Sequence, residues 1–360
     1  MSYLTNVNRL RNIDVSYSDK MFVADFNNDG VLDIAMINEK ENNIGVFLGN
    51  QNGTYQSAQI FPVGKSPGKI TGGDFNGDGN MDLAITNRES NNVTILLGDG
   101  QGGFIEPAGS PLNTPDPYDI VLTDFDGNGT LDLIVTNQSI GSISIFQGNG
   151  AGQFSLVSSL TVGSKVKGIA AADFNGDGLL DLAICDEANN QVVIFIGNGL
   201  GDFIRMNPVE AGLLPQKIVT ADFNHDGKID LAVLNSVSSM VSILLGNGNG
   251  SFQPALNFIP EFTIDEIKVD DVNQDGFSDL LLIRNGVGEG VLYGTPDGQF
   301  SWEKPKNKQS KTEDEEPLLL ASNLEQSEDE SVDEAQPEET KKRKKFKKKK
   351  KEKKKKKEKD

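Results

Sequence analysis

A short acidic loop recurs six times along the chain, and its residue types are those that bind a hard cation. In each copy the first, third, fifth and ninth positions are Asp or Asn, and the sixth is Gly. Oxygen side chains at alternate positions of a tight loop converge on one point, and the glycine supplies the positive φ that closes the turn. The donors include neither His nor Cys, so the loops predict Ca²⁺ sites in preference to Mg²⁺ or Mn²⁺.

Each loop offers three carboxylates and one amide, and the backbone carbonyl at the seventh position is expected to be a further ligand. Up to six Ca²⁺ ions are therefore expected. The predicted metal ligands, loop by loop, are Asp25, Asn27, Asp29 and Asp33; Asp74, Asn76, Asp78 and Asp82; Asp124, Asp126, Asn128 and Asp132; Asp173, Asn175, Asp177 and Asp181; Asp222, Asn224, Asp226 and Asp230; and Asp271, Asn273, Asp275 and Asp279.

Two other interpretations of the loops are weaker. An EF-hand loop ends with Glu at its twelfth position and lies between two helices, whereas these loops end with Asp at the ninth position and continue into strand-like residues. A single copy could equally be an ordinary hairpin closed by Asx turns. Six copies in one register argue against that alternative.

The spacing of the loops indicates a repeat architecture. Their first residues are 49, 50, 49, 49 and 49 residues apart. Each unit contains four short runs that are β-branched or alternating and are bounded by Gly and Asn, as at 118–125, 131–136, 142–146 and 153–162. Four strands repeated radially predict an all-β fold, a β-propeller of four-stranded blades. Six blades are favoured and seven are possible, with residues 1–20 as a candidate outer strand of another blade.

The predicted domain limits follow from the repeat. A propeller is expected over 1–305, with units at about 10–58, 59–108, 109–157, 158–206, 207–255 and 256–304. A Gly-rich turn of the type G-N-G-x-G-x-F recurs in the units and places an aromatic residue at a fixed offset. These aromatic residues are Tyr55, Phe104, Phe154, Phe203, Phe252 and Phe300, and we expect them to pack between blades.

The charge is divided unequally along the chain. Residues 1–303 contain 14 basic and 38 acidic side chains, a net charge of −24, whereas residues 304–360 contain 20 basic and 15 acidic, a net charge of +5. An acidic body is expected to bind cations rather than nucleic acid. An acidic disordered linker is predicted over 306–340 and a Lys-rich disordered tail over 341–360. The tail either is simply solvated or contacts nucleic acid, an anionic membrane or its own acidic segment.

Little in the sequence indicates catalysis or a membrane span. The only histidine, His225, occupies a variable loop position, and the only cysteine, Cys185, lies in a strand-like run where a buried side chain is expected. No nucleophile–base set is evident, so an enzyme is not expected. The first ten residues show no apolar signal-peptide core, and no run approaches the ~18 apolar residues of a membrane span.

With its D-F-N-x-D-G-x-x-D-L loops and G-N-G-x-G-x-F turns, the chain resembles the FG-GAP/VCBS repeats of integrin α-subunit head domains and microbial surface proteins. The resemblance covers about residues 10–303. It implies that each loop lies between the first and second strands of a blade and binds Ca²⁺ through positions 1, 3, 5, 7 and 9. It also implies a recognition or adhesion module for a protein or glycan partner, with calcium mainly structural. The alternatives are a propeller lyase or hydrolase, or a scaffold tethered through the Lys-rich tail to nucleic acid or membrane. Family members are usually exported, but no signal peptide is visible, so the compartment stays open.

Overall fold

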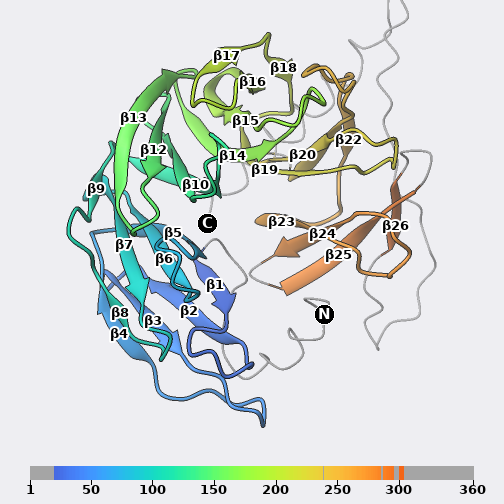
Figure 1. The fold of residues 1–360 in the computed structure, drawn as a ribbon. Coiled ribbons are helices and arrows are strands. Elements are labelled where there is room, and N and C mark those ends of the chain that lie inside the picture. The colour runs from blue at the N-terminus through green and yellow to red at the C-terminus, as the bar shows by residue number, and fades with distance from the viewer. Residues whose placement is uncertain (1–19, 238, 285–286, 296–299, 304–360) are drawn as a thin grey trace, which may run out of the picture. The chain divides into compact units, whose positions relative to one another are not determined.

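The computed structural model describes residues 20–303, except for 238, 285–286 and 296–299. These residues form six antiparallel sheets that follow one another along the chain (Figure 1). The first sheet contains β1 (Met21–Ala24), β2 (Asp33–Asn38), β3 (Asn43–Phe47) and β4 (Gln59–Pro62). The second contains β5 (Pro67–Gly73), β6 (Asp82–Asn87), β7 (Asn92–Gly98), β8 (Phe104–Ile105) and β9 (Leu112–Asn113). The third contains β10 (Pro117–Thr123), β11 (Asp132–Asn137), β12 (Ser142–Gly148) and β13 (Phe154–Thr161).

The other three sheets repeat this order. The fourth contains β14 (Val166–Ala172), β15 (Asp181–Asp186), β16 (Gln191–Gly197), β17 (Phe203–Arg205) and β18 (Val209–Glu210). The fifth contains β19 (Pro215–Ala221), β20 (Asp230–Asn235), β21 (Met240–Leu244) and β22 (Leu256–Phe258). The sixth contains β23 (Glu266–Asp270), β24 (Asp279–Arg284), β25 (Val287–Gly294) and β26 (Phe300–Glu303). One 3₁₀ turn, η1 (Glu187–Asn189), joins β15 to β16.

Two sheets have five strands because their outer strand is interrupted. In the second sheet both β8 and β9 pair with β7, and in the fourth both β17 and β18 pair with β16. Each pair of short strands therefore replaces the single fourth strand that the other sheets have. The all-β, four-stranded organisation predicted from the sequence is confirmed, and the described residues contain six such sheets and no α-helix. The candidate outer strand of another blade, residues 1–20, lies outside the described residues except for residue 20.

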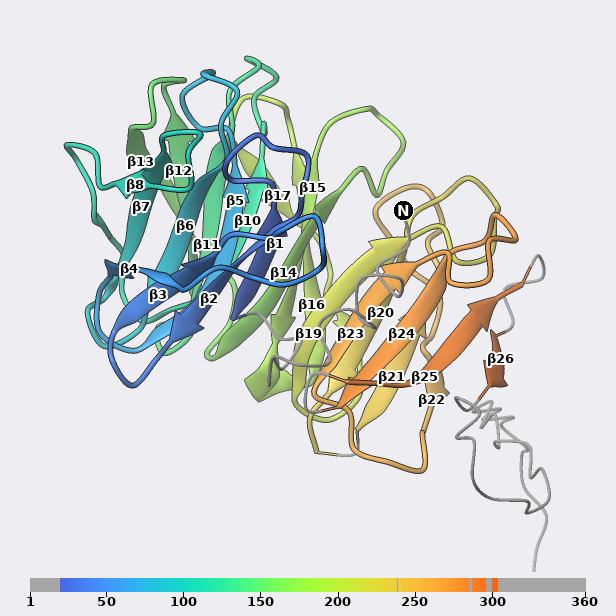
Figure 2. The same ribbon diagram turned by 90° about the horizontal axis from the view of Figure 1, so that it is seen from below.

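Neighbouring sheets pack face to face. Five hydrophobic clusters each combine side chains from two consecutive sheets, from the first pair to the fifth and sixth. The first strands of consecutive sheets also touch, as β14 with β19 and β19 with β23 (Figures 1 and 2). Since both faces of an intermediate sheet are covered, the second strands β6, β11, β15 and β20 are buried at every residue. Cys185 lies in this buried interior, as predicted.

Aromatic side chains link successive repeat units. The residue at loop position 2 in the first to fifth units packs against the aromatic residue that follows the Gly-rich turn of the next unit, with ring centroids 5.4–6.4 Å apart. Phe26 with Phe104 and Phe174 with Phe252 are two such pairs. In the first, second and fourth units, the carbonyl oxygen of position 2 also accepts a hydrogen bond from the N–H of a turn glycine in the next unit, at 2.9–3.1 Å. The inter-blade role expected for the aromatic residues holds for these five pairs.

Candidate metal loops

Each acidic loop connects the first and second strands of its sheet. Position 1 directly follows the first strand in all six units, and position 9 is the first residue of the second strand, as with Asp25 after β1 and Asp33 at the start of β2. The flanking elements are strands, so the loops are not EF-hands. This is the placement that the family resemblance implied.

The loop backbone makes two left-handed residues in every copy. Position 6 is glycine with φ between 79° and 89°, as its role in closing the turn requires. Position 4 is also left-handed, with φ between 57° and 79°. Three loops have glycine at position 4, but the first, fifth and sixth have Asn28, His225 and Gln274. The left-handed conformation of position 4 was not predicted from the sequence, although glycine at this position in three of the six copies could have indicated it.

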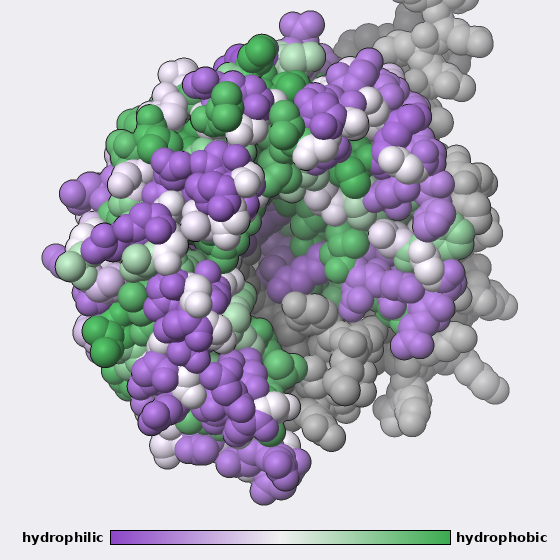
Figure 3. All heavy atoms as spheres, in the orientation of Figure 1, coloured by the Kyte–Doolittle hydropathy of each residue, from purple (hydrophilic) through white to green (hydrophobic). Residues whose placement is uncertain are grey.

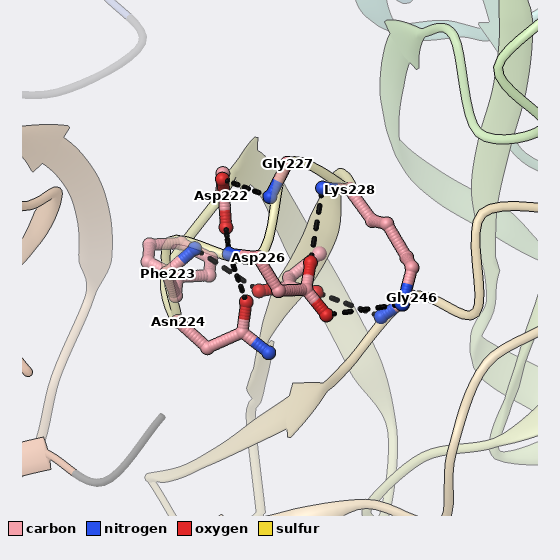
Figure 4. A network of polar contacts seen from close by, with 8 residues as sticks. Asp222, Phe223, Asn224, Asp226, Gly227, Lys228 and Gly246 are labelled. Carbon is pink, nitrogen blue, oxygen red and sulfur yellow. Dashed lines mark hydrogen bonds and ion pairs between the residues drawn. The ribbon is translucent and has the colours of Figure 1, made fainter. Parts of the chain in front are cut away.

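Position 1 organises the loop through its carboxylate. In all six copies it accepts the N–H of position 6 at 2.7–3.1 Å. In five copies it also accepts the N–H of position 5. Figure 4 shows these two bonds in the fifth loop, from Gly227 and Asp226 to Asp222. The position-1 carboxylate is only half-buried. The lone pairs that these N–H groups do not use are therefore available to a cation.

Position 5 is exposed in all six loops, whereas position 3 is partly buried in every loop except the sixth. The side-chain oxygen of position 3 accepts the N–H of position 5 at 2.9–3.2 Å. The side-chain oxygen of position 5 accepts the N–H of position 7 at 2.7–3.0 Å. In the fifth loop Asp226 also receives the Lys228 ammonium at 3.2 Å (Figure 4). These nested turns hold the oxygens of positions 1, 3 and 5 on one small loop.

Position 9 is fully buried and joins three parts of each unit. One of its oxygens accepts the N–H of position 2 at 2.8–3.1 Å. The other accepts the N–H of a glycine at the end of the third strand, at 2.7–3.0 Å. In the fifth unit these partners are Phe223 and Gly246 (Figure 4). The position-9 aspartate therefore fastens the loop to the sheet, a role that the sequence analysis missed.

The partner glycine is required by space. It is Gly49, Gly98, Gly148, Gly197, Gly246 and Gly294 in the six units, and a Cβ at any of them would lie 2.1–2.4 Å from the backbone carbonyl oxygen of loop position 8. Its distance from position 9 is 16 residues in five units and 15 in the last. This constant spacing is the sequence signal that could have revealed the pair.

Burial and crowding raise the pKa of the position-9 carboxyl groups. Desolvation is the largest cause in all six, and the neighbouring loop aspartates add to it, whereas the backbone N–H donors, two in five units and three for Asp279, act in the opposite direction. The pKa of Asp82, Asp132 and Asp230 is raised to about 6. Negative charge at this site is thus costly unless a cation compensates it.

The third loop brings the carboxylates closest to a metal-binding arrangement. Oxygens of Asp124, Asp126 and Asp132 all lie within 4.8 Å of one another. Hard oxygen donors of this number and charge suit Ca²⁺. In the other five loops position 3 is Asn, so its ligand atom would be an amide oxygen. The chemistry and placement of the residues fit a calcium ion, and the individual ligands and the seventh-position carbonyl stay predictions.

A second polar region lies at the strand ends away from the metal loops. We call polar cluster the side chains of Lys69, Arg88, Tyr118, Asp119, Lys167 and Glu187. The Arg88 guanidinium and the Lys167 ammonium lie 5.4 and 5.6 Å from the centroid of the Tyr118 ring. Burial raises the pKa of Tyr118 to about 12, and the charge of Asp119 adds to the effect.

Charged pairs complete the polar cluster. Lys69 pairs with Asp119 at 3.3 Å, and Lys167 and Lys165 each pair with Glu187 at 2.7 Å. Although burial alone would raise the pKa of Glu187, the two lysines hold it below its usual value. The cluster therefore presents fixed cations and an aromatic ring from the second, third and fourth sheets.

Comparison with known families matches this chain to the FG-GAP-like repeat. The matches cover residues 25–85, 74–135, 124–184, 173–233 and 222–282, and so follow the loops from the first to the sixth. The chain belongs to the FG-GAP-like repeat family. No curated protein sequence is significantly similar to it.

Solved structures share the fold of this FG-GAP-like repeat protein at low sequence identity. A chain in the complex of BBS1N with ARL6DN is 15% identical, with a TM-score of 0.57, over 81% of this chain and 83% of that one. An Agrocybe aegerita lectin described as recognising non-reducing terminal N-acetylglucosamine is 19% identical, with a TM-score of 0.54, over 79% of both chains. The Pseudomonas aeruginosa periplasmic gluconolactonase PpgL is 15% identical, with a TM-score of 0.52, over 72% of both. These likenesses support the propeller fold alone. In the part of the chain that the structure describes, no helix is long and apolar enough to cross a membrane.

Proposed function

We propose that this chain is a calcium-stabilised β-propeller that recognises a protein or glycan partner, with calcium in a mainly structural role. The observation that carries the proposal is the sixfold repetition of one loop geometry, in which a buried carboxylate with a raised pKa stands beside two or more further oxygen donors. A bound Ca²⁺ would supply the missing positive charge at each loop. Positions 1, 3, 5 and 9 of each loop would hold it.

The structural role follows from what the loops are attached to. Position 9 bonds the loop to the end of the third strand, and position 2 packs against the next unit. An ion that orders the loop therefore strengthens contacts inside its unit and to the next one. At free calcium tenfold above the dissociation constant, each site would add about 1.4 kcal/mol to stability.

The polar cluster is the surface that we propose for partner recognition. Arg88, whose side chain is 41% exposed and lies over the largely buried Tyr118 ring, can pair with polar or acidic groups of a partner. Figure 3 shows hydrophilic and hydrophobic residues intermixed around a hollow on the face that it draws. The structural relatives include a protein solved with a protein partner and a lectin, which is consistent with either partner class.

We further propose that the module is not catalytic. His225, the only histidine, is exposed and meets the Phe277 ring edge-on at 4.8 Å. Cys185, the only cysteine, is fully buried, and burial raises the pKa of its thiol.

The calcium part is tested by thermal unfolding of the full chain in metal-free buffer, in millimolar Ca²⁺ and in millimolar Mg²⁺. A large rise in Tm that is specific to Ca²⁺ supports the loops as sites. An unchanged Tm with no bound calcium by equilibrium dialysis would contradict it.

The recognition part is tested with the calcium-loaded full chain on a glycan array and against candidate protein partners. Any ligand found is then measured with Tyr118→Ala, and with Ile204→Ala on the outer strand β17 as the control. Loss of binding with Tyr118→Ala alone assigns recognition to the polar cluster. Equal binding by both variants would place the recognition surface elsewhere.

A further inference from the structure

One face of the first sheet stands apart from the hydrophobic clusters that join the described sheets. On its other face, Ile37 and Val46 pack against the second sheet (Figure 1). Successive side chains of a strand point to opposite faces, so Met36 and Phe47 belong to the first of these faces. None of the five clusters that the described residues form contains Met36, Phe47 or Ile60. We call the surface that these three side chains make the open face.

In the five later sheets the equivalent face is covered by the unit that precedes it in the chain. The residue that corresponds to Met36 is fully buried in each, and it belongs to the cluster that joins its sheet to the preceding one. These residues are Ile85, Val135, Ile184, Val233 and Leu282. Met36 itself is only partly buried. The open face is therefore the surface on which a preceding unit would pack.

The open face contains a pocket of about 440 Å³. Its apolar lining includes Met36, Phe47, Ala58 and Ile60, and Lys20 also lines it. Ile60 is 59% exposed. Apolar side chains that exclude water from such a pocket stabilise the folded state.

The residues that precede the first unit have the position and the pattern of an occupant. They end at Lys20, which lines the pocket, and β1 begins at the next residue. Among residues 12–18, Ile13, Val15 and Tyr17 alternate with polar residues, a period-2 pattern typical of a strand with one apolar face. Seven extended residues span roughly 23 Å, similar to the roughly 20 Å of the six-residue strand β2. The segment is therefore long enough to cross the open face.

We propose that residues 12–18, which lie outside the described residues, dock on the open face and that Ile13, Val15 and Tyr17 fill its pocket. The segment takes the place that a preceding unit has in the later sheets, and so caps the first unit of the repeat. A terminal unit needs such a cap because its outward face has no neighbouring unit to cover it. This position differs from that of an outer strand, which would pair with a sheet edge through backbone hydrogen bonds.

The test measures how fast a maleimide labels a cysteine placed on the open face of the full chain. Ile60→Cys is compared with Ile204→Cys, which makes the same change at a 68% exposed residue of the outer strand β17. The native Cys185 is fully buried and does not compete for the reagent. We expect the Ile60→Cys thiol to react roughly tenfold more slowly than the Ile204→Cys thiol, because the docked segment covers it.

Displacing the segment should remove this protection. In the Ile60→Cys chain, Val15→Lys puts an ammonium group on the apolar side of the segment, and Ser16→Lys puts one on its polar side. We expect Val15→Lys to speed labelling roughly tenfold and Ser16→Lys to leave it slow. Circular dichroism checks that the variants are folded, and Val15→Ser replaces Val15→Lys if that variant is not. Equal labelling of the Ile60→Cys and Ile204→Cys thiols, or slow labelling that the two segment variants affect alike, would overturn the proposal.

Discussion

Acidification of the metal-free protein from pH 7 to pH 5 is expected to stabilise it. The folded-state pKa of Asp82, Asp132 and Asp230 is about 6, against an ordinary value of 3.8. Between these two values the folded chain binds more protons than the unfolded chain, so the free energy of unfolding falls as pH rises through this window and recovers as pH falls. Linkage gives about 1 kcal/mol for each group between pH 7 and pH 5, or about 3–4 kcal/mol for the three.

Calcium is expected to reverse the sign of this dependence. An ion at the proposed sites would bind the deprotonated carboxylates, so protons would compete with it and acidification would weaken the calcium-loaded protein. The measurement is urea unfolding followed by circular dichroism at pH 5, 6 and 7, in buffer treated with a chelating resin and in millimolar Ca²⁺. Asp230→Asn removes one titrating group and should make the metal-free profile shallower by about 1 kcal/mol. If metal-free stability instead falls from pH 7 to pH 5, burial and crowding do not govern these carboxyl groups.

Two further predictions concern packing and backbone strain. Phe174→Ala removes a buried ring that packs on Phe252 of the next unit, 5.6 Å away between centroids, and should cost about 3–5 kcal/mol in urea unfolding. Leu200→Ala, at a 79% exposed residue, should change stability by less than about 0.5 kcal/mol, and similar losses for the two would refute the inter-unit role. Gln274→Gly replaces a left-handed residue, φ 61°, by the glycine found at position 4 of three other loops. It should raise stability by roughly 0.5–1 kcal/mol, and a lower Tm would show that the position is not strained.

The repeat allowed the fold to be predicted from the sequence, because each feature could be checked against five other copies. Strand order, loop placement and the glycine at position 6 all follow from local turn chemistry and period-2 patterns, which act over a few residues. The interrupted outer strands were not predicted, although Pro107 and Pro208 mark the breaks. A proline removes only one N–H donor, and where the ladder resumes depends on packing against the neighbouring strand.

The metal loops were predicted in part, again because their residues recur in six copies. The residue type of Asp230 indicates an oxygen donor. Its burial and its hydrogen bonds from the N–H groups of Phe223 and Gly246 depend on contacts with Gly246, which is distant in sequence. The polar cluster was not predicted, although Tyr118 and Lys167 occupy equivalent positions of neighbouring units, 49 residues apart. The residue type at this position differs between units, so the repeat predicts the place of these side chains but not their chemistry.

Contacts between neighbouring units are expected to couple ion binding at one loop to ion binding at the next. The position-2 residue of a loop is held on one side by the buried position-9 carboxylate of its own unit and on the other by the turn of the next unit, as Phe174 is by Asp181 and by Gly250 and Phe252. An ion that fixes one loop therefore also lowers the freedom of the neighbouring turn. The conformational cost that the next loop must meet on binding is then smaller, which is positive coupling without any contact between the ions. In a chain of nearest-neighbour units this effect passes along the repeat from loop to loop. Calcium binding by such a chain should be steeper than that of six independent loops.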